Sequence, residues 1–328
     1  MTNNKWNTTS SIYNSLSDFC ITPAQSSLVS FPDQKGQYDF LLKIMDNRPL
    51  IVFFNAAFTG AQKQNGTNQN PTADSSASNS IRKGLRLPSF SGYNLLEQVD
   101  ASYVCINDPS LYLSDKLNLA WYLGANDIHA QTVIVQVLKK IIDQLKPSRL
   151  IFVGGSGGGY AAMYYSSFFS ESLALPWNPQ TDIFKFIPDS VTTYLRHAWN
   201  FDGSIEEGKD YLQGIIETDL FSRYTKENPS SSNYLIYLQN ASDHHHIDAH
   251  LKPFLSNLGI SQPTELTRVG GDFSPRRHLK IMNTGSGHAA PSFASLVETL
   301  NNLATTDLTW HEMFASNKIN EIISIRGR

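Results

Sequence analysis

Residues 154–158 form the pattern Gly-Gly-Ser-Gly-Gly, which places Ser156 at the centre of a G-x-S-x-G motif. The motif follows an apolar run of strand length at 149–153 and precedes a helical pattern at 160–169. A nucleophilic serine on a tight strand-to-helix turn needs small neighbours, because strand and helix approach closely there while the hydroxyl stays accessible. The arrangement predicts that Ser156 is the nucleophile of an acyl-transfer reaction.

Two other kinds of site also use glycine-rich turns between a strand and a helix. A dinucleotide-binding turn needs an acidic residue about 20 positions on, at the end of the next strand. Here the next apolar run, 173–175, leads into Pro176 with no acid before Asp182. A phosphate-binding P-loop needs a Gly-Lys-Ser/Thr sequence, which does not follow. A purely structural glycine turn is the third alternative, and we favour the nucleophile.

A serine nucleophile requires a base and an acid that orients the base. In strand–turn–helix serine enzymes these follow in the order Ser, Asp or Glu, His. Asp243 follows the apolar run 234–238, and His288 lies in a glycine-rich turn after the run 279–282. We therefore predict Asp243 as the acid and His288 as the base, with a solvated loop histidine as the alternative for His288. The rival acids are Asp248 and Asp272.

The oxyanion formed when a serine attacks an ester must meet hydrogen-bond donors that are already in place. The backbone N–H of Gly157 is one candidate donor. The second is expected from the loop after the apolar run 50–54, which indicates Ala56 with Asn55 beside it. An ordinary strand end is the alternative interpretation of these two residues.

Residues 243–250 hold four of the nine histidines of the chain. His246 and His250 have the i, i+4 spacing that could bind zinc from one helix face. However, no HExxH glutamate and no suitably spaced cysteine completes such a site, since Cys20 and Cys105 lie far apart. We therefore predict no bound metal and interpret the histidines as a polar rim beside the acid.

Six short apolar runs, rich in β-branched and aromatic residues, are predicted as strands covered on both faces. Helical patterns lie between several of these runs. One begins after Asp127 as N-cap, continues to about Leu145 and stops before Pro147, and another spans 291–303. Strands that alternate with helices predict an α/β fold with a mostly parallel sheet. The six runs are residues 50–54, 101–106, 149–153, 173–175, 234–238 and 279–282.

The same pattern divides the chain into segments. Residues 1–49 are expected to supply an N-terminal extension and the first strands, and 50–177 the core sheet with the motif of Ser156. Residues 59–93 are polar and then basic, which indicates a long loop or a disordered insertion. Residues 178–232 lack a strong strand pattern and are predicted as a cap. Residues 233–328 would complete the sheet and carry the acid and histidine loops.

Composition excludes several classes of function. The 328 residues include 26 Lys and Arg and 29 Asp and Glu, so the formal net charge is −3. This balance gives no support to nucleic-acid binding or to a polybasic membrane contact. No stretch approaches the roughly 20 apolar residues of a membrane span, and the N-terminal residues lack the apolar core of a secretory signal. We expect a cytoplasmic protein without a disulfide framework.

With these motifs in place, the chain resembles the α/β-hydrolase superfamily from about residue 50 to the C-terminus. Within it, the chain is loosely similar to bacterial capsule-polysaccharide O-acetyltransferases of that fold. The resemblance implies that Ser156 is the nucleophile, His288 the base and Asp243 its orienting acid. The segments that carry it are 155–159 (Gly-Ser-x-Gly-Gly), 178–180 (Asn-Pro-Gln), 243–251 (Asp, nearby His, Leu) and 287–288 (Gly-His).

The expected function is two-step acyl transfer by a catalytic triad, with an O-acetyltransferase or O-acyl esterase of a surface polysaccharide favoured. Acetyl-CoA is an expected acyl donor, and no bound cofactor is expected. The partner is then a carbohydrate or a small ester. A carboxylesterase on small or lipid esters and a catalytically silent accessory protein in glycan assembly are the alternatives. The expected substrate-binding residues are Asn55, Trp177, Asn178, Gln180, Arg82 and Arg86.

Overall fold

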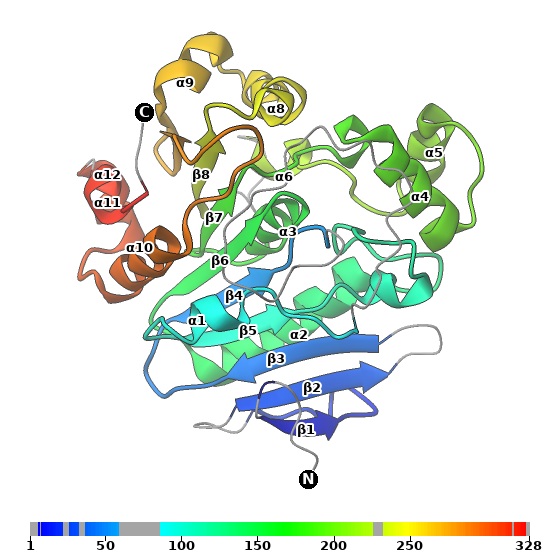
Figure 1. Cartoon of the computed structure of the whole chain (residues 1–328). Helices are drawn as coiled ribbons and strands as arrows, with labels where there is room; N and C mark the ends of the chain where they lie inside the picture. The colour runs from blue at the N-terminus through cyan, green and yellow to red at the C-terminus, as the bar shows by residue number, and fades with distance from the viewer. Residues whose placement is uncertain are drawn as a thin grey trace.

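The computed structural model describes residues 6, 8–21, 26–32, 37–58, 86–225, 232–316 and 318–325. They build one ten-stranded sheet with the strand order β1-β2-β3-β5-β4-β6-β7-β8-β10-β9 (Figure 1). In this order, all neighbours from β5 to β10 pair in parallel. The strand β3 pairs in antiparallel fashion with both β2 and β5, and β9 does so with β10. The structure confirms the predicted α/β fold with a mostly parallel sheet.

Each of the six predicted strands is present. The sheet also contains β1, β2 and β3, which lie within residues 1–49, and the antiparallel edge strand β9, which was not predicted. The strands are β1 Thr9–Ile12, β2 Ser26–Pro32, β3 Gln37–Lys43, β4 Leu50–Phe54, β5 Ser102–Ile106, β6 Leu150–Gly155, β7 Leu173–Trp177, β8 Tyr234–Asn240, β9 Gly271–Ser274 and β10 Arg277–Met282.

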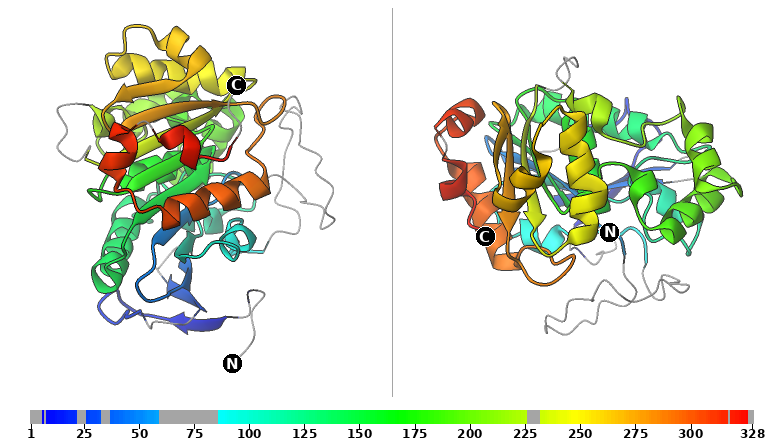
Figure 2. Two further views of the ribbon diagram at one scale, coloured as in Figure 1. Left: turned by 90° about the vertical axis from the view of Figure 1, so that its left-hand side faces the viewer. Right: turned by 90° about the horizontal axis from the view of Figure 1, so that it is seen from above.

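Helices cover both faces of the sheet (Figure 2). Side chains alternate along each strand, so in β4 Val52 and Phe54 enter one apolar cluster while Ile51 and Phe53 enter the other. This two-sided burial explains why the parallel strands are continuously apolar. The first cluster includes residues of α2 Ala130–Leu145, α3 Gly157–Ser166, α4 Pro188–Trp199 and α8 Lys252–Asn257, and the second includes residues of α1 Tyr93–Leu96, α10 Phe293–Thr305, α11 Trp310–Ala315 and α12 Ile319–Ile322.

The start of α2 differs from the sequence prediction. His129, not Asp127, precedes the first helical residue, Ala130. The reason is a tight turn, in which the backbone N–H groups of Ala125 and Ile128 each donate to the other's carbonyl at 2.9 and 3.1 Å. The turn leaves Asp127 outside the helix. The predicted stop near Leu145 is confirmed, because Lys146 adopts a left-handed conformation there.

The described residues of the segment 178–232, predicted as a cap, form four helices joined by turns, with one isolated β-bridge between Asp182 and Asp219. The helices are η2 Ile183–Lys185, α4, α5 Ile205–Leu212 and α6 Phe221–Tyr224. Within 59–93 the structure describes residues 86–93, so most of the predicted long loop lies outside the described residues. The segment boundaries and the role of the cap stay predictions. In the part of the chain that the structure describes, no helix has both the length and the apolarity to cross a membrane.

Candidate active site

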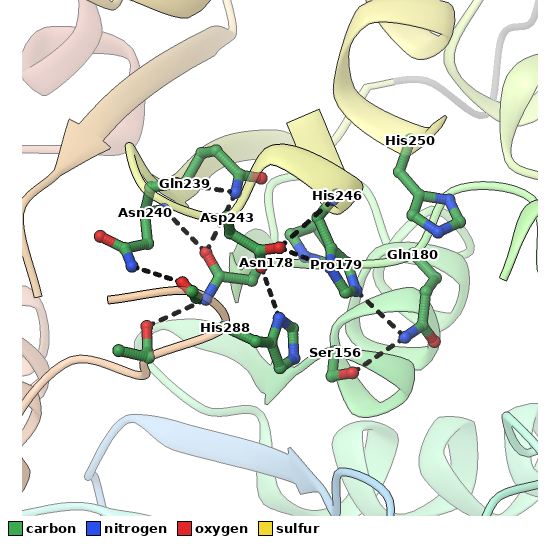
Figure 3. A network of polar contacts seen from close by, with 12 residues as sticks. Ser156, Asn178, Pro179, Gln180, Gln239, Asn240, Asp243, His246, His250 and His288 are labelled. Atoms are coloured by element: carbon green, nitrogen blue, oxygen red, sulfur yellow. Dashed lines mark hydrogen bonds and ion pairs between the residues drawn. The ribbon is translucent and has the colours of Figure 1, made fainter. Parts of the chain in front are cut away.

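Parallel strands end at the same edge of a sheet, and the predicted catalytic residues follow three of these ends. Ser156 directly follows β6, Asp243 lies three residues after β8, and His288 lies six residues after β10. Ligands of open α/β sheets bind at this carboxyl edge. The topology therefore brings together three residues that are up to 132 positions apart, counted from Ser156 to His288 as 288 − 156 (Figure 3).

Ser156 has the strained backbone expected of a serine on a sharp turn. Its φ of 54° and ψ of −121° lie outside the regions that residues with a side chain ordinarily adopt. The turn is held on both sides, since the Ser156 N–H donates to the carbonyl of Trp177 at 3.0 Å and its carbonyl accepts from Tyr160 at 3.1 Å. Such strain persists only where the surroundings enforce it, and it is common at functional sites.

The glycines of the motif permit this turn. A Cβ built on Gly154 would lie 2.2 Å from the carbonyl oxygen of Gly158, across the strand-to-helix turn. A Cβ on Gly158 would lie 2.4 Å from the carbonyl oxygen of Phe54. Neither position has room for a side chain, so β4, β6 and the start of α3 approach one another at backbone distance.

Asp243 is buried and accepts hydrogen bonds from two histidines. His288 Nδ1 lies 2.5 Å from Asp243 Oδ2, and His246 Nδ1 lies 3.0 Å from Asp243 Oδ1. The two imidazole rings stack, with centroids 4.1 Å apart and planes inclined by 23°. One carboxylate thus orients two histidines, of which only His288 was predicted as its partner.

The charges of this cluster follow from burial and hydrogen bonding. Burial alone would raise the pKa of Asp243, but the hydrogen bonds from His246 and His288 outweigh it, and the pKa lies well below its usual range. Burial lowers the pKa of His246 to about 4, against the opposing effect of Asp243. At neutral pH the cluster therefore contains an ionised Asp243 and a neutral His246.

Gln180 makes the direct side-chain contact with the Ser156 hydroxyl. Its Nε2 lies 2.9 Å from Ser156 Oγ and 3.3 Å from His246 Nε2. Among the hydrogen bonds of the described residues, none joins Ser156 to His288. The second ring nitrogen of His288 lies on the side of the ring that faces Ser156 (Figure 3). Catalytic hydrogen bonds of this type are often formed only when substrate is bound.

The two predicted oxyanion donors lie on neighbouring segments, the start of α3 and the loop after β4. Gly157 is the first residue of α3, where a backbone N–H has no partner within the helix. A Cβ on Gly158 would lie 2.6 Å from the carbonyl oxygen of Asn55, so the start of α3 abuts the loop that carries Ala56. In the described part of the chain, neither the N–H of Gly157 nor that of Ala56 has a hydrogen-bond acceptor. Both are free to meet an oxyanion.

Two of the predicted substrate-binding amides hold loops in place. Asn55 Nδ2 donates to the carbonyl of Ser89 at 2.7 Å, and Asn55 is 3% exposed. Asn178 Nδ2 donates to the carbonyl of Ala289 at 3.0 Å, and Asn178 is 0% exposed. Asn178 thus ties the end of β7 to the loop of His288. A contact with substrate, as expected from the sequence, would require either side chain to leave these buried positions.

Of the remaining predicted binding residues, the structure describes Trp177 and Arg86. The Trp177 indole packs on Gly155, where an added Cβ would lie 2.1 Å from Trp177 Nε1, and it contacts the apolar cluster on the face opposite α3. Arg86 is exposed at the beginning of a described segment, and Arg82 lies outside the described residues.

The two rival acids, Asp248 and Asp272, contact other residues. Asp248 is exposed and forms an ion pair with Lys252 at 2.7 Å. Asp272 lies on the edge strand β9 and contacts His278 Nδ1 at 2.6 Å. The geometry favours Asp243 as the partner of His288.

Among the residues that the structure describes, one group could hold a metal ion. Ligand atoms of Asp243, His246 and His288 all lie within 4.8 Å of one another. This set differs from the His246 and His250 pair that the sequence spacing indicated. The Nδ1 atoms of both histidines already contact Asp243, so a metal ion would have to displace these hydrogen bonds.

Solved structures of other proteins share the fold of this chain. No family model and no curated protein matches the chain. The chain is similar to the capsule O-acetyltransferase of Neisseria meningitidis serogroup A, with a TM-score of 0.54 and 15% identity over 85% of this chain and 95% of that one. A mutant of that enzyme in complex with CoA matches equally. The chain has an α/β-hydrolase-like fold.

A second solved structure supports the same fold. The Glycosylation Associate Protein complex from Streptococcus agalactiae matches with a TM-score of 0.52 and 13% identity over 86% of this chain. The match covers 47% of that chain, so this protein corresponds to about half of it. At these identities the likeness concerns the fold alone.

Two residues of the site were missed or assigned differently from the sequence. His246 was grouped with a polar rim, although it lies three positions after Asp243 on the short helix α7 His244–His246. Trp121, whose indole Nε1 donates to Gln180 Oε1 at 2.6 Å, had no signal in the sequence. The contact between Trp121 and Gln180 forms only because the loop before α2 folds against the cap segment.

Proposed function

We propose that this protein is a serine acyl-transfer enzyme in which Ser156 is the nucleophile. The observation that carries the proposal is the strained turn at Ser156 together with the hydrogen bond between the buried Asp243 and the half-buried His288. Ser156 Oγ attacks the carbonyl carbon of an ester or thioester as its proton passes to His288 Nε2. The Asp243 carboxylate holds the proton of His288 on Nδ1, which leaves Nε2 as the acceptor.

The subsequent steps use the same groups. The N–H groups of Gly157 and Ala56 bind the oxyanion of the tetrahedral intermediate. His288 then donates its proton to the leaving group, and an acyl-Ser156 ester forms. Water or a second hydroxyl, deprotonated by His288, attacks this ester and releases Ser156 in its original state. These steps balance without a metal ion or a redox cofactor.

The test of this proposal is labelling with a fluorophosphonate probe, which reacts with activated serines. The wild-type protein should be labelled, and Ser156→Ala should not be. His288→Ala should fold like the wild type and lose nearly all labelling. A wild-type protein that is not labelled would refute the proposal and favour the catalytically silent accessory protein instead.

We further propose that the acyl acceptor is a carbohydrate hydroxyl and that acetyl-CoA is a donor. Two comparisons support this: the similar fold of a capsule O-acetyltransferase and the CoA complex of its mutant. A bound hydroxyl held in attack geometry outcompetes bulk water. Acetyl-CoA with an accepting oligosaccharide should therefore turn over faster than acetyl-CoA alone. If short-chain esters are cleaved well and no surface glycan in a panel accelerates turnover, the carboxylesterase function is correct.

The charged residues of the predicted polar loop offer a second test of the acceptor. Charge reversal at Arg82 and Arg86 should raise the KM for an anionic acceptor and leave hydrolysis of a small neutral ester unchanged. A cytoplasmic location and the absence of nucleic-acid binding, both expected from the sequence, stay predictions.

A further inference from the structure

The orientation of the Gln180 amide is fixed by a residue that can only donate. Trp121 Nε1–H donates to the amide oxygen of Gln180 at 2.6 Å, and an indole nitrogen has no acceptor capacity. Trp121 is fully buried and packs edge-on against Tyr194. The next residue, Tyr122, is held by its backbone N–H to Asp108 at 2.7 Å. The indole is therefore a rigid anchor, and the amide nitrogen of Gln180 must point the other way.

This orientation of the amide determines where the protons of Gln180 and His246 lie. The Gln180 Nε2 has two hydrogens, one directed to Ser156 Oγ at 2.9 Å and one to His246 Nε2 at 3.3 Å. His246 Nε2 must then be an acceptor, so the proton of the neutral ring lies on Nδ1. From there it donates to Asp243 Oδ1 at 3.0 Å. Every polar atom from Trp121 to Asp243 has a compatible partner in this single assignment.

We propose that Gln180 and His246 are positioning residues that hold the Ser156 hydroxyl as an acceptor, so that its own proton is directed to His288. The inference rests on the proposed function. Because the Gln180 amide donates to Ser156 Oγ, the lone pair on that side is occupied. The hydroxyl proton must then point towards a different acceptor. The same hydrogen bond stabilises the negative charge that develops on Oγ as the proton leaves.

This role differs from the one expected from the sequence, in which Gln180 binds substrate. A substrate-binding amide would affect KM, whereas a residue that acts through Ser156 affects kcat. Gln180 is 0% exposed, and its polar atoms contact Trp121, Ser156 and His246. The geometry therefore favours an action through Ser156.

The first experiment measures kcat and KM for p-nitrophenyl acetate, together with the rate of fluorophosphonate labelling. Gln180→Glu keeps the size of the side chain and its acceptor for Trp121, but it replaces the donor that faces Ser156 with a carboxylate oxygen. Gln180→Met removes both. We expect each variant to lower kcat and the labelling rate by about 10² to 10³, as for loss of a preorganised donor at other sites. KM should change by less than about threefold.

A second pair of variants tests His246 without removing Gln180. His246→Gln retains an acceptor for Gln180 and a donor for Asp243, whereas His246→Leu retains neither. We expect His246→Gln to be at least about tenfold faster than His246→Leu in both assays. In the Gln180→Met background this difference should shrink, because the acceptor that His246→Gln retains acts through Gln180.

A third pair uses two buried tryptophans. Trp121→Phe removes the anchor of the amide, and the labelling rate should fall by about tenfold as the amide loses its fixed orientation. Trp199→Phe is the matched control, since it removes a buried indole N–H outside the hydrogen bonds of Ser156. If a Gln180 variant fails to fold, the His246 and Trp121 pairs decide the question.

The outcomes separate this inference from the proposed function. A labelled wild type whose Gln180 and His246 variants react at the wild-type rate overturns the inference alone. A rise in KM at unchanged kcat does the same, and so does an equal loss in His246→Gln and His246→Leu. An unlabelled wild type overturns both. The stated losses in kcat, with rescue by His246→Gln, support it.

Discussion

Replacement of Asp243 by Asn tests the centre of the site, because this carboxylate has two histidine donors. Asp243 Oδ2 and Oδ1 accept from His288 and His246, at 2.5 and 3.0 Å. An asparagine offers one acceptor oxygen and one donor NH₂ in the same space. One of the two histidines must then face a donor, and it can remain hydrogen-bonded only by moving its proton from Nδ1 to Nε2.

Both orientations of the new amide damage the site. If the NH₂ faces His288, the proton on Nε2 of that ring points towards Ser156, and His288 cannot act as the base. If it faces His246, the proton on Nε2 of that ring meets the NH₂ of Gln180, and the hydrogen bond at 3.3 Å is lost. The first case corresponds to the wrong tautomer of a serine triad, which lowers kcat by about 10⁴. That is about 5 kcal/mol of transition-state stabilisation.

The assay is kcat for p-nitrophenyl acetate, with the fluorophosphonate labelling rate as a check that does not depend on substrate choice. We expect Asp243→Asn to lose between about 10² and 10⁴ in both, the lower value applying if the amide settles towards His246. Asp248→Asn is the control, because Asp248 is exposed and pairs only with Lys252 among the described residues. A larger loss in Asp248→Asn than in Asp243→Asn would refute the assignment of the acid.

Three further predictions follow from the site and its surroundings. Ser156→Ala and His288→Ala should each abolish turnover, and the double variant should be no slower than either, because the residues act as a unit; a double variant about 10³ slower would contradict this. Gly158→Ala should lower the free energy of unfolding by about 1 to 3 kcal/mol in urea titrations, since its Cβ would lie 2.4 Å from the Phe54 carbonyl oxygen. Burial lowers the pKa of His250 to about 2 from 6.5. The native state then binds fewer protons than the unfolded chain, so stability falls as pH drops below about 6.5, by about 1 kcal/mol per pH unit per such histidine. His250→Phe should give a shallower fall between pH 6 and 4, and an unchanged slope would contradict the prediction.

The sheet could be predicted from the sequence where strands are buried on both faces. A run such as Leu50–Phe54 is continuously apolar because its two faces meet two apolar clusters, and this signal is local. The edge strand β9 could not be found in this way, because its residues are only partly buried and its sequence is polar. The predicted start of α2 was wrong for a related reason. Asp127 has the residue type of an N-cap, but the turn between Ala125 and Ile128 decides where the helix begins.

The site residues also divide into those with a local sequence signal and those placed only by the folded chain. Ser156 could be predicted because the glycines that permit its backbone conformation are its immediate neighbours in sequence. Asp243 and His288 could be predicted from strand order, since parallel strands deliver the residues after their ends to one edge. The contact of Gln180 with Ser156 depends on how the segment after β7 folds back over α3. No pattern of residue types encodes that path.

The histidine run after Asp243 shows how one sequence feature supports two chemistries. Read as a spacing, His246 and His250 indicate metal ligands, whereas in the fold His246 donates to Asp243 and His250 Nδ1 accepts from the backbone N–H of Thr181 at 3.3 Å. Both rings must be neutral, because His246 Nε2 accepts from Gln180 and His250 Nδ1 accepts from Thr181, and burial lowers the pKa of both histidines. A neutral ring stacked on His288 adds no positive charge beside it, so the proposed transfer of the Ser156 proton to His288 meets no repulsion from its neighbour. A second protonated imidazole at a centroid distance of 4.1 Å would oppose that step. In the proposed mechanism, burial of His246 is therefore a condition for proton transfer to His288, and a variant that exposes His246 to solvent should slow acyl transfer even with Ser156, Asp243 and His288 in place.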